Sequence, residues 1–231
     1  MQDEQSEPTL EKDPYFEALF RVGAHFAYSK SRRHPTAAPF IFGSKVRVEI
    51  FDLEKTKAAL EKAKIFVRDL AGAGKQILFV SGKHEAREAM KKGAEAVGLP
   101  HVAGRFIGGT LTNFPQIRKR VEKLERLLGE RERGELVKYT KKERLLIDRE
   151  IETLEETFGG IVSMKSLPGA VFVIDSKREH IAVAEATKLK IPTIALSNSD
   201  CDLTEVNYSI PANDSARASI DSALFLASTA S

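Results

Sequence analysis

Three segments of the sequence place glycine, lysine or aspartate where a phosphate or a substrate could bind. AGAGK (71–75) has the glycines and the lysine of a phosphate-binding loop, but it precedes the apolar run QILFV (76–80). Phosphate loops instead follow a strand and open a helix, so we interpret AGAGK as the end of a helix. SGK (81–83) does follow an apolar run and Asp175 ends another, which leaves a small-molecule site there as an alternative hypothesis.

Other arrangements for catalysis or metal binding are missing from the sequence. The five histidines show no pair spacing typical of a metal site. There is no Ser–His–Asp pattern and no nucleophile elbow. Cys201 is the only cysteine, which excludes an internal disulfide and a multi-cysteine metal site. The sequence therefore predicts a protein without catalytic residues, bound metal or cofactor.

Contact with a polyanion is the chemistry that the cations favour. The segment KSRRHP carries four cationic or titratable side chains with no acidic residue among them: Lys30, Arg32, Arg33 and His34. Its lack of apolar periodicity predicts a loop. Loop cations without carboxylate partners suit contact with phosphates, and arginine can also stack on an exposed base. The net charge of only +3 means that this local distribution must carry the argument.

A second basic segment, GRFIGGTLTNFPQIRKR (104–120), joins a glycine pair to an apolar-spaced run. Arg118 and Lys119 fall in the first turns of the predicted helix, near Arg105. Cations at a helix start oppose the helix dipole, at a cost of about a few tenths of a kcal/mol each, unless an anion binds there. They also fit a solvated face, with Glu122 one turn on. The residues alone leave RNA contact and a solvated face both open.

The elements that hold these segments predict an α/β fold with helices on both sides of a mostly parallel sheet. AVFVID (170–175) and IPTIAL (191–196) are apolar strands, and the helical segment 176–190 connects them. This is a parallel crossover unit, and strands so apolar are covered on both faces. Ser176 and Glu179 are spaced as a capping box at the start of the helix.

The first half of the chain predicts further elements of the same fold. They are a helix from Pro14 with Asp13 as its cap, a strand over 45–51, a helix over 54–74, a strand over 76–80 and a helix over 83–98. Segment 29–43 is predicted to be a loop.

A helical hairpin is predicted between the two halves of this domain. Apolar residues step by three or four from Phe114 to Leu128 and from Ile147 to Phe158, and TKKE (140–143) has a capping-box pattern. We therefore predict an antiparallel hairpin inserted in the α/β domain. The predicted divisions are a disordered tail over 1–12, a discontinuous α/β domain over 13–112 and 160–228, and the hairpin over 113–159.

Size and composition agree with an ordinary soluble protein. The 231 residues can bury a substantial core, with 42% hydrophobic and 30% charged residues. The acidic, polar start is unlike a secretory signal, and no apolar run approaches the ~18 residues that span a bilayer. We expect a cytoplasmic protein.

Several segments, in order along the chain, also resemble a known family. RRHPTAAPFIFG, RFIGGTLTNFPQIRKRVEKL and LPGAVFVIDSKREHIAVAEATKLKIPTIAL are similar to ribosomal protein S2 of the small subunit, bacterial or organellar type. The resemblance runs from about Leu19 to the C-terminal helix. It implies a flavodoxin-like three-layer sandwich with a protruding coiled coil and no enzymatic activity. It also implies a structural role in translation, bound to small-subunit rRNA between head and body beside neighbouring ribosomal proteins. Because members help to anchor ribosomal protein S1 in many bacteria, that protein is a candidate partner.

The resemblance implies a set of rRNA-facing positions when it is carried over segment by segment. They are Lys30, Arg32, Arg33, His34, Lys83, Arg105, Thr112, Asn113, Arg118 and Lys119. Gly108 and Gly109 would then form a sharp turn into the hairpin. Lys190 stands where members commonly have glycine. A left-handed backbone there would cost roughly 1 kcal/mol with a side chain, so we expect this turn to be adjusted. An interaction module whose hairpin holds partner proteins remains an alternative hypothesis.

Overall fold

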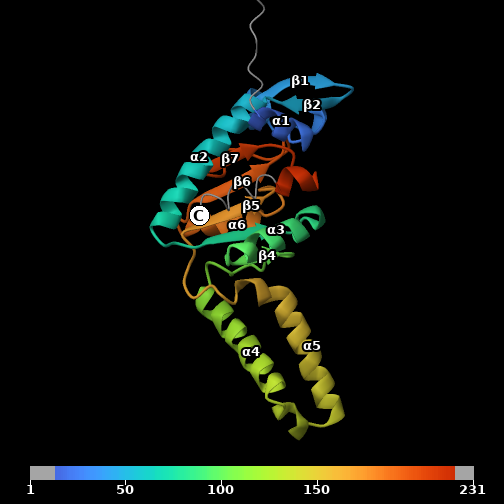
Figure 1. Cartoon of the computed structure of the whole chain (residues 1–231), viewed down its shortest axis with the longest axis vertical. Coiled ribbons are helices and arrows are strands. Elements are labelled where there is room, and N and C mark those ends of the chain that lie inside the picture. Colours follow the sequence, from blue (N-terminus) through green and yellow to red (C-terminus); the bar gives the residue numbers. More distant parts are fainter. Residues whose placement is uncertain (1–13, 222–231) are drawn as a thin grey trace, which may run out of the picture.

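The computed structural model describes residues 14–221, and it is elongated. A parallel sheet occupies the middle of the molecule, a small antiparallel hairpin lies at one end, and a long helical hairpin projects from the other (Figure 1). No helix within residues 14–221 is long and apolar enough to cross a membrane.

The described chain mixes helices and strands along its length. The α-helices are α1 (Pro14–Arg21), α2 (Leu53–Gly72), α3 (His84–Ala96), α4 (Phe114–Glu132), α5 (Lys141–Phe158) and α6 (His180–Lys188). The strands are β1 (Ile41–Lys45), β2 (Val48–Phe51), β3 (Ile77–Ser81), β4 (His101–Ala103), β5 (Ala170–Ile174), β6 (Thr193–Ser197) and β7 (Tyr208–Pro211). Short 3-10 helices are η1 (Lys30–Arg32), η2 (Pro35–Phe40), η3 (Glu135–Lys138) and η4 (Gly159–Ile161).

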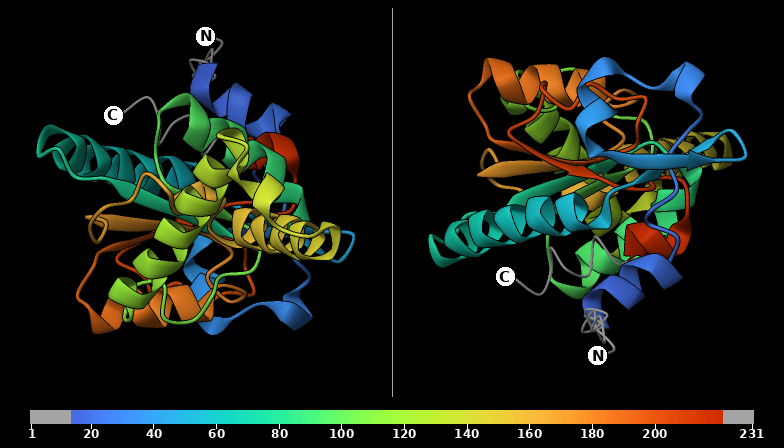
Figure 2. Two further views of the ribbon diagram at one scale, coloured as in Figure 1. Left: turned by 90° about the horizontal axis from the view of Figure 1, so that it is seen from below. Right: turned by 90° about the horizontal axis from the view of Figure 1, so that it is seen from above.

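The main sheet has the order β4-β3-β5-β6-β7, and each neighbouring pair is parallel. Helix α6 covers one face of this sheet, while α2 and α3 cover the other (Figure 2). The α/β class with a flavodoxin-like three-layer arrangement is therefore confirmed. Because the strands are parallel, their carboxyl ends share one edge, where ligands bind in many folds of this kind.

The alternation of side chains along each strand builds two cores. On β3, Ile77 and Phe79 pack with α2 and α3, whereas Leu78 and Val80 pack on the opposite face with α6. The second core continues into the helical hairpin through residues such as Leu124. The root of the hairpin thus shares buried apolar surface with the sheet.

The helical hairpin forms as its sequence pattern predicts. Helices α4 and α5 bury Leu124 and Ile151, and Lys123 pairs with Glu150 on the partly exposed rim. The predicted capping box is confirmed: the Thr140 hydroxyl accepts from the Glu143 amide, and the Glu143 carboxylate accepts from the Thr140 amide. The division into a discontinuous domain and an insertion stays a prediction.

The prediction of one strand over 45–51 is wrong. The chain reverses at Val46 and Arg47, whose φ angles are 51° and 67°, and an antiparallel hairpin of β1 and β2 results. Positive φ at both central residues is what a tight hairpin turn of type I′ requires, although it is costly for a β-branched side chain. The alternation of apolar residues continues through the turn, so the pattern could not show the reversal. The predicted loop over 29–43 correspondingly contains η1, η2 and part of β1.

The capping box predicted at Ser176 and Glu179 is also wrong. Helix α6 begins only at His180, and its N-cap residue Glu179 makes no side-chain cap bond. The hydroxyl of Ser176 shares a 3.0 Å hydrogen bond with that of Ser197. The carboxylate of Glu179 instead accepts from the backbone amide of Gly82, 97 residues earlier in the chain. Tertiary contacts therefore take both side chains away from the helix start.

The remaining sequence predictions have mixed outcomes. The segment 71–75 ends α2, with Gly74 at a φ of 65°. Lys190 has a left-handed backbone with a φ of 57°, so the adjustment expected for its side chain does not occur. Strands β4 and β7 were not predicted, because each is short and lacks a clear apolar run. The predicted cap Asp13, the tail over 1–12 and the end of the predicted domain at 228 lie outside the described residues.

Candidate nucleic-acid interface

The loop before η2 is tied to the carboxyl edge of the sheet. The backbone amide of His34 donates to the carbonyl of Ser199 at 2.7 Å, and the backbone amide of Tyr28 donates to the Ser199 hydroxyl at 3.1 Å. Ser199 follows β6, so segment 28–34 is fixed against the end of that strand. The His34 ring shares a 2.8 Å hydrogen bond with the Thr36 hydroxyl.

The two arginines of this loop have different environments. Arg33 donates to Glu49 at 2.8 Å, and the carboxylate side chain of Glu49 is only 3% exposed. Arg32 lies 3.3 Å from Asp200, and its guanidinium is 3.9 Å from the centre of the Tyr28 ring. Arg33 therefore neutralises a buried carboxylate, whereas Arg32 stays at the surface. Lys30 is exposed and forms no ion pair with any residue in 14–221.

Lys83 is buried, which differs from the position expected of an rRNA contact. Its ammonium lies 2.6 Å from Asp214 and 2.9 Å from Asp175. Burial alone would lower the pKa of Lys83, but these two carboxylates outweigh it and raise the pKa, so the ammonium stays charged. Asp214 also accepts from the Asn198 side chain at 3.0 Å. In this structure, Lys83 compensates internal charge and is out of reach of an external phosphate.

Three side chains of the same cluster lie close enough together to hold a metal ion: Asp175, Cys201 and Asp214. Two observations favour the resident ammonium over a metal ion. Both carboxylates already pair with Lys83. Burial, followed by the nearby charge of Asp175, raises the pKa of the Cys201 thiol to about 12, which disfavours the thiolate that a metal would need.

Two turns that contain glycine, one after β3 at Gly82 and one before α4 at Gly109, donate backbone amides to carboxylates of the protein itself. Gly82 donates to Glu179 at 2.7 Å. Glu185 on α6 accepts from the amides of Gly109, Leu111 and Thr112, the last two at 2.9 and 3.0 Å. Gly109 has a φ of 92°, which glycine adopts without steric cost. These turns therefore resemble anion sites that already hold an anion, which argues against the hypothesis of a nucleotide site there.

The start of the helical hairpin carries exposed polar and cationic groups. Thr112 and Asn113 are exposed, and Asn113 makes no side-chain cap bond to α4. Arg118 is held by the Val162 carbonyl at 3.0 Å and by Glu125 at 3.1 Å, as the solvated-face alternative expects. Lys119 is exposed and has no ion pair in the described chain. Arg120, the next residue, is likewise exposed and unpaired in the described chain, so Lys119 and Arg120 are the free cations in the first turns of this helix.

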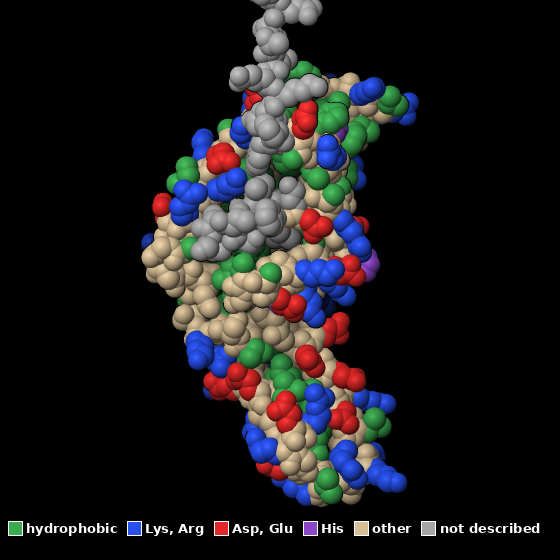
Figure 3. Space-filling model, viewed as in Figure 1, with side chains coloured by type: hydrophobic (Ala, Val, Ile, Leu, Met, Phe, Trp, Pro, Cys, Tyr) green, Lys and Arg blue, Asp and Glu red, His purple; other side chains and the backbone are tan. Residues whose placement is uncertain are grey.

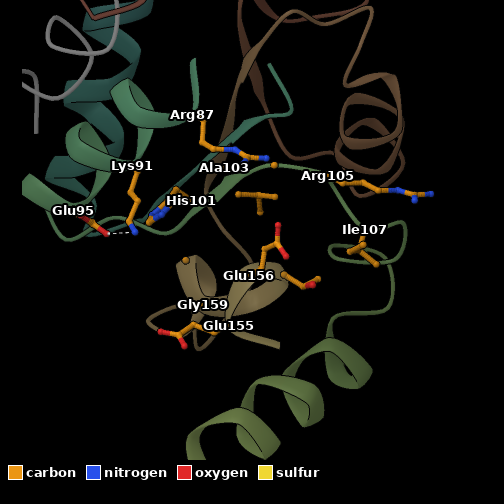
Figure 4. Close-up of a pocket in the computed structure, with 14 residues that line it drawn as sticks. Arg87, Lys91, Glu95, His101, Ala103, Arg105, Ile107, Glu155, Glu156 and Gly159 are labelled. Atoms are coloured by element: carbon orange, nitrogen blue, oxygen red, sulfur yellow. Dashed lines mark ion pairs between the residues drawn. The ribbon is translucent and has the colours of Figure 1, made fainter. Parts of the chain in front are cut away.

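A cleft of about 570 Å³ lies between the sheet and the root of the hairpin, lined by parts of α3, β4 and the end of α5. Arg87 extends over the cleft toward Glu156, whereas the guanidinium of Arg105 points out of it (Figure 4). Arg87 and Arg105 form no ion pair within residues 14–221. Because the lining mixes both charges, the exposed cations around the cleft are better phosphate ligands than its interior.

The sequence-predicted residues thus fall into groups rather than one contiguous site. Lys30, Arg105, Thr112, Asn113 and Lys119 are exposed, while Arg32, Arg33 and Arg118 are ion-paired and Lys83 is buried. Sequence reasoning missed Arg87, Lys177 and Arg178, whose side chains are exposed near the carboxyl edge of the sheet. The spacing of SKRE (176–179) favours a helix start, whereas its two adjacent cations are the signal for this surface. On the hairpin, Lys and Arg alternate with Asp and Glu, as on a solvated face (Figure 3).

Comparison with known proteins identifies clear relatives. The family model of ribosomal protein S2 matches residues 19–231. The chain is 44% identical over 202 residues to small ribosomal subunit protein uS2 of a Nitratiruptor species, covering 87% of this chain and 76% of that protein. It is 42% identical over 198 residues to the protein of the same name from Coprothermobacter proteolyticus, covering 86% and 74%. The corresponding Roseiflexus protein is 42% identical over 203 residues, covering 88% and 78%.

Proposed function

The chain belongs to the ribosomal protein S2 family, a family of structural proteins without enzymatic activity, and we propose that it is a constituent of the small ribosomal subunit that binds rRNA in the cytoplasm. The observation that carries this proposal is the family match over residues 19–231, together with relatives whose names place them in that subunit.

Exposed cations without carboxylate partners support rRNA contact at the carboxyl edge and the hairpin start. Lys30, Arg105 and Lys119 meet this description within the described chain. Thr112 and Asn113, exposed beside them, can donate hydrogen bonds to phosphate or sugar oxygens. Arg32, Arg33, His34 and Arg118 would contribute with whatever donors their present partners leave free. The burial of Lys83 gives it no part in this proposal.

Neighbouring small-subunit proteins are proposed as further partners. Three apolar side chains near the tip of the helical hairpin are exposed: Val137, Leu145 and Leu146. Each is more than half exposed, and grouped apolar exposure on a projecting element is typical of a protein contact. A contact with ribosomal protein S1 stays a prediction from the family resemblance.

A reconstitution experiment tests the rRNA proposal. Small-subunit particles that lack this protein are mixed with the full chain, and the dissociation constant is measured from 50 to 200 mM salt. The variant with Lys30→Ala, Arg105→Ala and Lys119→Ala should bind more weakly. Its salt slope, the decrease of the logarithm of the binding constant with the logarithm of salt concentration, should be smaller by about 2–3, because each phosphate contact contributes about 0.9 to that slope. The control variant Lys62→Ala with Arg68→Ala removes exposed cations on α2. A wild-type chain that does not bind the particles at all would refute the proposed function.

A further inference from the structure

We propose that Lys177 and Arg178, in the loop after β5, form an RNA phosphate-binding site together with Arg32. The proposal rests on the proposed function and extends the interface to the segment between β5 and α6. Lys177 and Arg32 are 145 residues apart in the chain, but both lie within 3.4 Å of the same carboxylate oxygen, Oδ2 of Asp200.

The shared carboxylate leaves this cluster positively charged. Two cationic side chains, 56% and 62% exposed, face one aspartate whose side chain is 9% exposed. The negative charge therefore lies at the base of the cluster and the positive charges at its surface. Arg178 is adjacent and exposed, and it forms no ion pair with any residue in 14–221. Arg32 and Lys177 share one counterion and the neighbouring Arg178 has no ion pair in the described chain, so the three cations make a local excess of positive charge that an anion can neutralise.

The ion pairs in the cluster are weak enough to be replaced by a phosphate. Their N–O distances of 3.3 and 3.4 Å exceed the ~2.7–2.9 Å of a well-made charged hydrogen bond. Exposed pairs of this kind contribute about 0–1 kcal/mol. Arg33 is the contrast in the same loop, because its 2.8 Å bond neutralises the buried carboxylate of Glu49. Asp200 thus orients the two cations without binding them tightly.

The backbone that carries Lys177 and Arg178 is tied to the sheet, because the Asp175 amide donates to the Leu196 carbonyl of β6 at 2.9 Å. The Asp175 side chain accepts from the Arg178 amide at 3.0 Å, and the Asp175 carbonyl accepts from the Glu179 amide at 3.0 Å. On the other side, the Tyr28 ring lies against the Arg32 guanidinium, and the Tyr28 hydroxyl bonds to Ser215 at 3.0 Å. A site held on both sides loses little conformational freedom on binding, which favours affinity.

A phosphodiester is the ligand that this geometry favours. A guanidinium stacked on a ring presents its N–H edge outward, where it can bind two phosphate oxygens at once. Lys177 and Arg178 supply further point charges on the same edge of the sheet as Lys30, whose loop is tied to Ser199. The site therefore extends the proposed rRNA surface from the loop before η2 to the end of β5. An acidic protein segment is the alternative ligand, and the crosslinking experiment distinguishes it from RNA.

The experiment compares two variants that each lose two positive charges. Lys177→Ala with Arg178→Ala alters the proposed site, while Lys165→Ala with Lys188→Ala changes two exposed lysines elsewhere. Full chains are titrated against small-subunit particles that lack this protein, between 50 and 200 mM salt. We expect the site variant to bind about tenfold more weakly than the control at low salt, with a salt slope lower by about 1–2. Asp200→Asn should bind at least as tightly as the wild type.

The outcomes separate this proposal from the broader function. If the Lys30, Arg105 and Lys119 variant binds weakly while the Lys177 and Arg178 variant matches its control, the site at β5 is refuted and the proposed function stands. If the wild type does not bind the particles, both fail. Crosslinks from a photoreactive residue at position 177 should reach rRNA; crosslinks to a ribosomal protein alone would refute an RNA ligand. Circular dichroism of each variant checks that the fold is intact.

Discussion

The carboxylate of Glu185 on α6 accepts a hydrogen bond from the backbone amide of Leu111 at 2.9 Å, across 74 residues of chain. The same carboxylate binds the amides of Gly109 and Thr112. A side chain of the sandwich therefore fixes the segment from which the helical hairpin begins. Because Thr112 is part of the proposed rRNA surface, Glu185 also sets the position of an expected contact.

Replacing Glu185 with Gln should loosen this segment. The glutamine has one acceptor oxygen where the carboxylate has two, and it has lost the charge that strengthens these bonds. Bonds to charged groups contribute about 1.5–3 kcal/mol, so the free energy of unfolding should fall by roughly that amount. Amide hydrogen exchange at Leu111 and Thr112 should become faster. Glu152→Gln, at an exposed position on α5, is the control. Unchanged exchange at these amides would show that the carboxylate is not needed.

Replacing Lys83 with Met should destabilise the protein strongly. The change removes the ammonium that lies 2.6 Å from Asp214 and 2.9 Å from Asp175, and leaves their charges uncompensated. Breaking a buried pair in this way costs about 3–5 kcal/mol, which urea unfolding can measure. Adding Asp214→Asn to the Met variant should recover part of the loss, because it removes one of the uncompensated charges. A single Met variant as stable as the wild type would contradict this account of the cluster.

Two glycine-to-alanine changes should have opposite effects on stability. At Gly160, a Cβ would overlap the backbone oxygen of His101, so the root of the hairpin must shift, at a cost of about 1–3 kcal/mol. At Gly129, within α4, the Cβ would meet the end of the flexible Arg133 side chain, and alanine should gain up to about 1 kcal/mol of helix propensity. Thermal unfolding of both variants checks the pair. Equal shifts in the melting temperature would mean that the close approach of Gly160 to the His101 oxygen does not destabilise the alanine variant.

Acid should destabilise the protein partly through His25. Burial lowers the pKa of His25, whose ring stacks on that of Phe20 with centroids 4.3 Å apart. The unfolded chain therefore takes up a proton near the ordinary value of 6.5, while the folded chain binds it only at lower pH. This contribution to stability is present above pH 6.5 and is lost as the pH falls through that range. His25→Phe keeps a stacked ring and should weaken the decrease between pH 7 and 5. An identical pH dependence in the variant would exclude this role.

The thiol of Cys201 should be inert in the folded protein. It is fully buried, and its pKa is raised to about 12, so almost no thiolate exists at pH 8. An aromatic disulfide reagent should react with one thiol per chain rapidly in 8 M urea and only at the rate of unfolding in buffer. Fast reaction in buffer would place the thiol near the surface.

Local patterns in the sequence predict the elements that local forces determine. The Thr140 and Glu143 capping box is satisfied within four residues, so its spacing alone suffices. The same spacing at Ser176 and Glu179 misleads, because Ser197 at the end of β6 and Gly82 in the turn after β3 bind these side chains. A helix start can therefore be predicted from its own residues only where no distant group competes for them.

The candidate interface was harder to predict because charge pairing is nonlocal. Arg33 has no acidic neighbour in sequence and Lys83 has Glu85 two residues away, yet their partners lie at positions 49, 175 and 214. Conversely, Lys177 and Arg178 stand next to Glu179, but that carboxylate is turned inward to Gly82. Exposure of each cation depends on which carboxylates the fold brings to it, and this information is not in the spacing.

Glu185 and Gly160 make close contacts at the root of the helical hairpin, which is therefore the pivot for any tilt of the hairpin. Helix α4 has 19 residues, which correspond to a reach of roughly 28 Å. Over that reach, a tilt of about 5° at the pivot would displace the far end by roughly 2–3 Å, nearly the length of a hydrogen bond. Rigidity at the pivot thus determines whether the far end can meet a fixed neighbour in register.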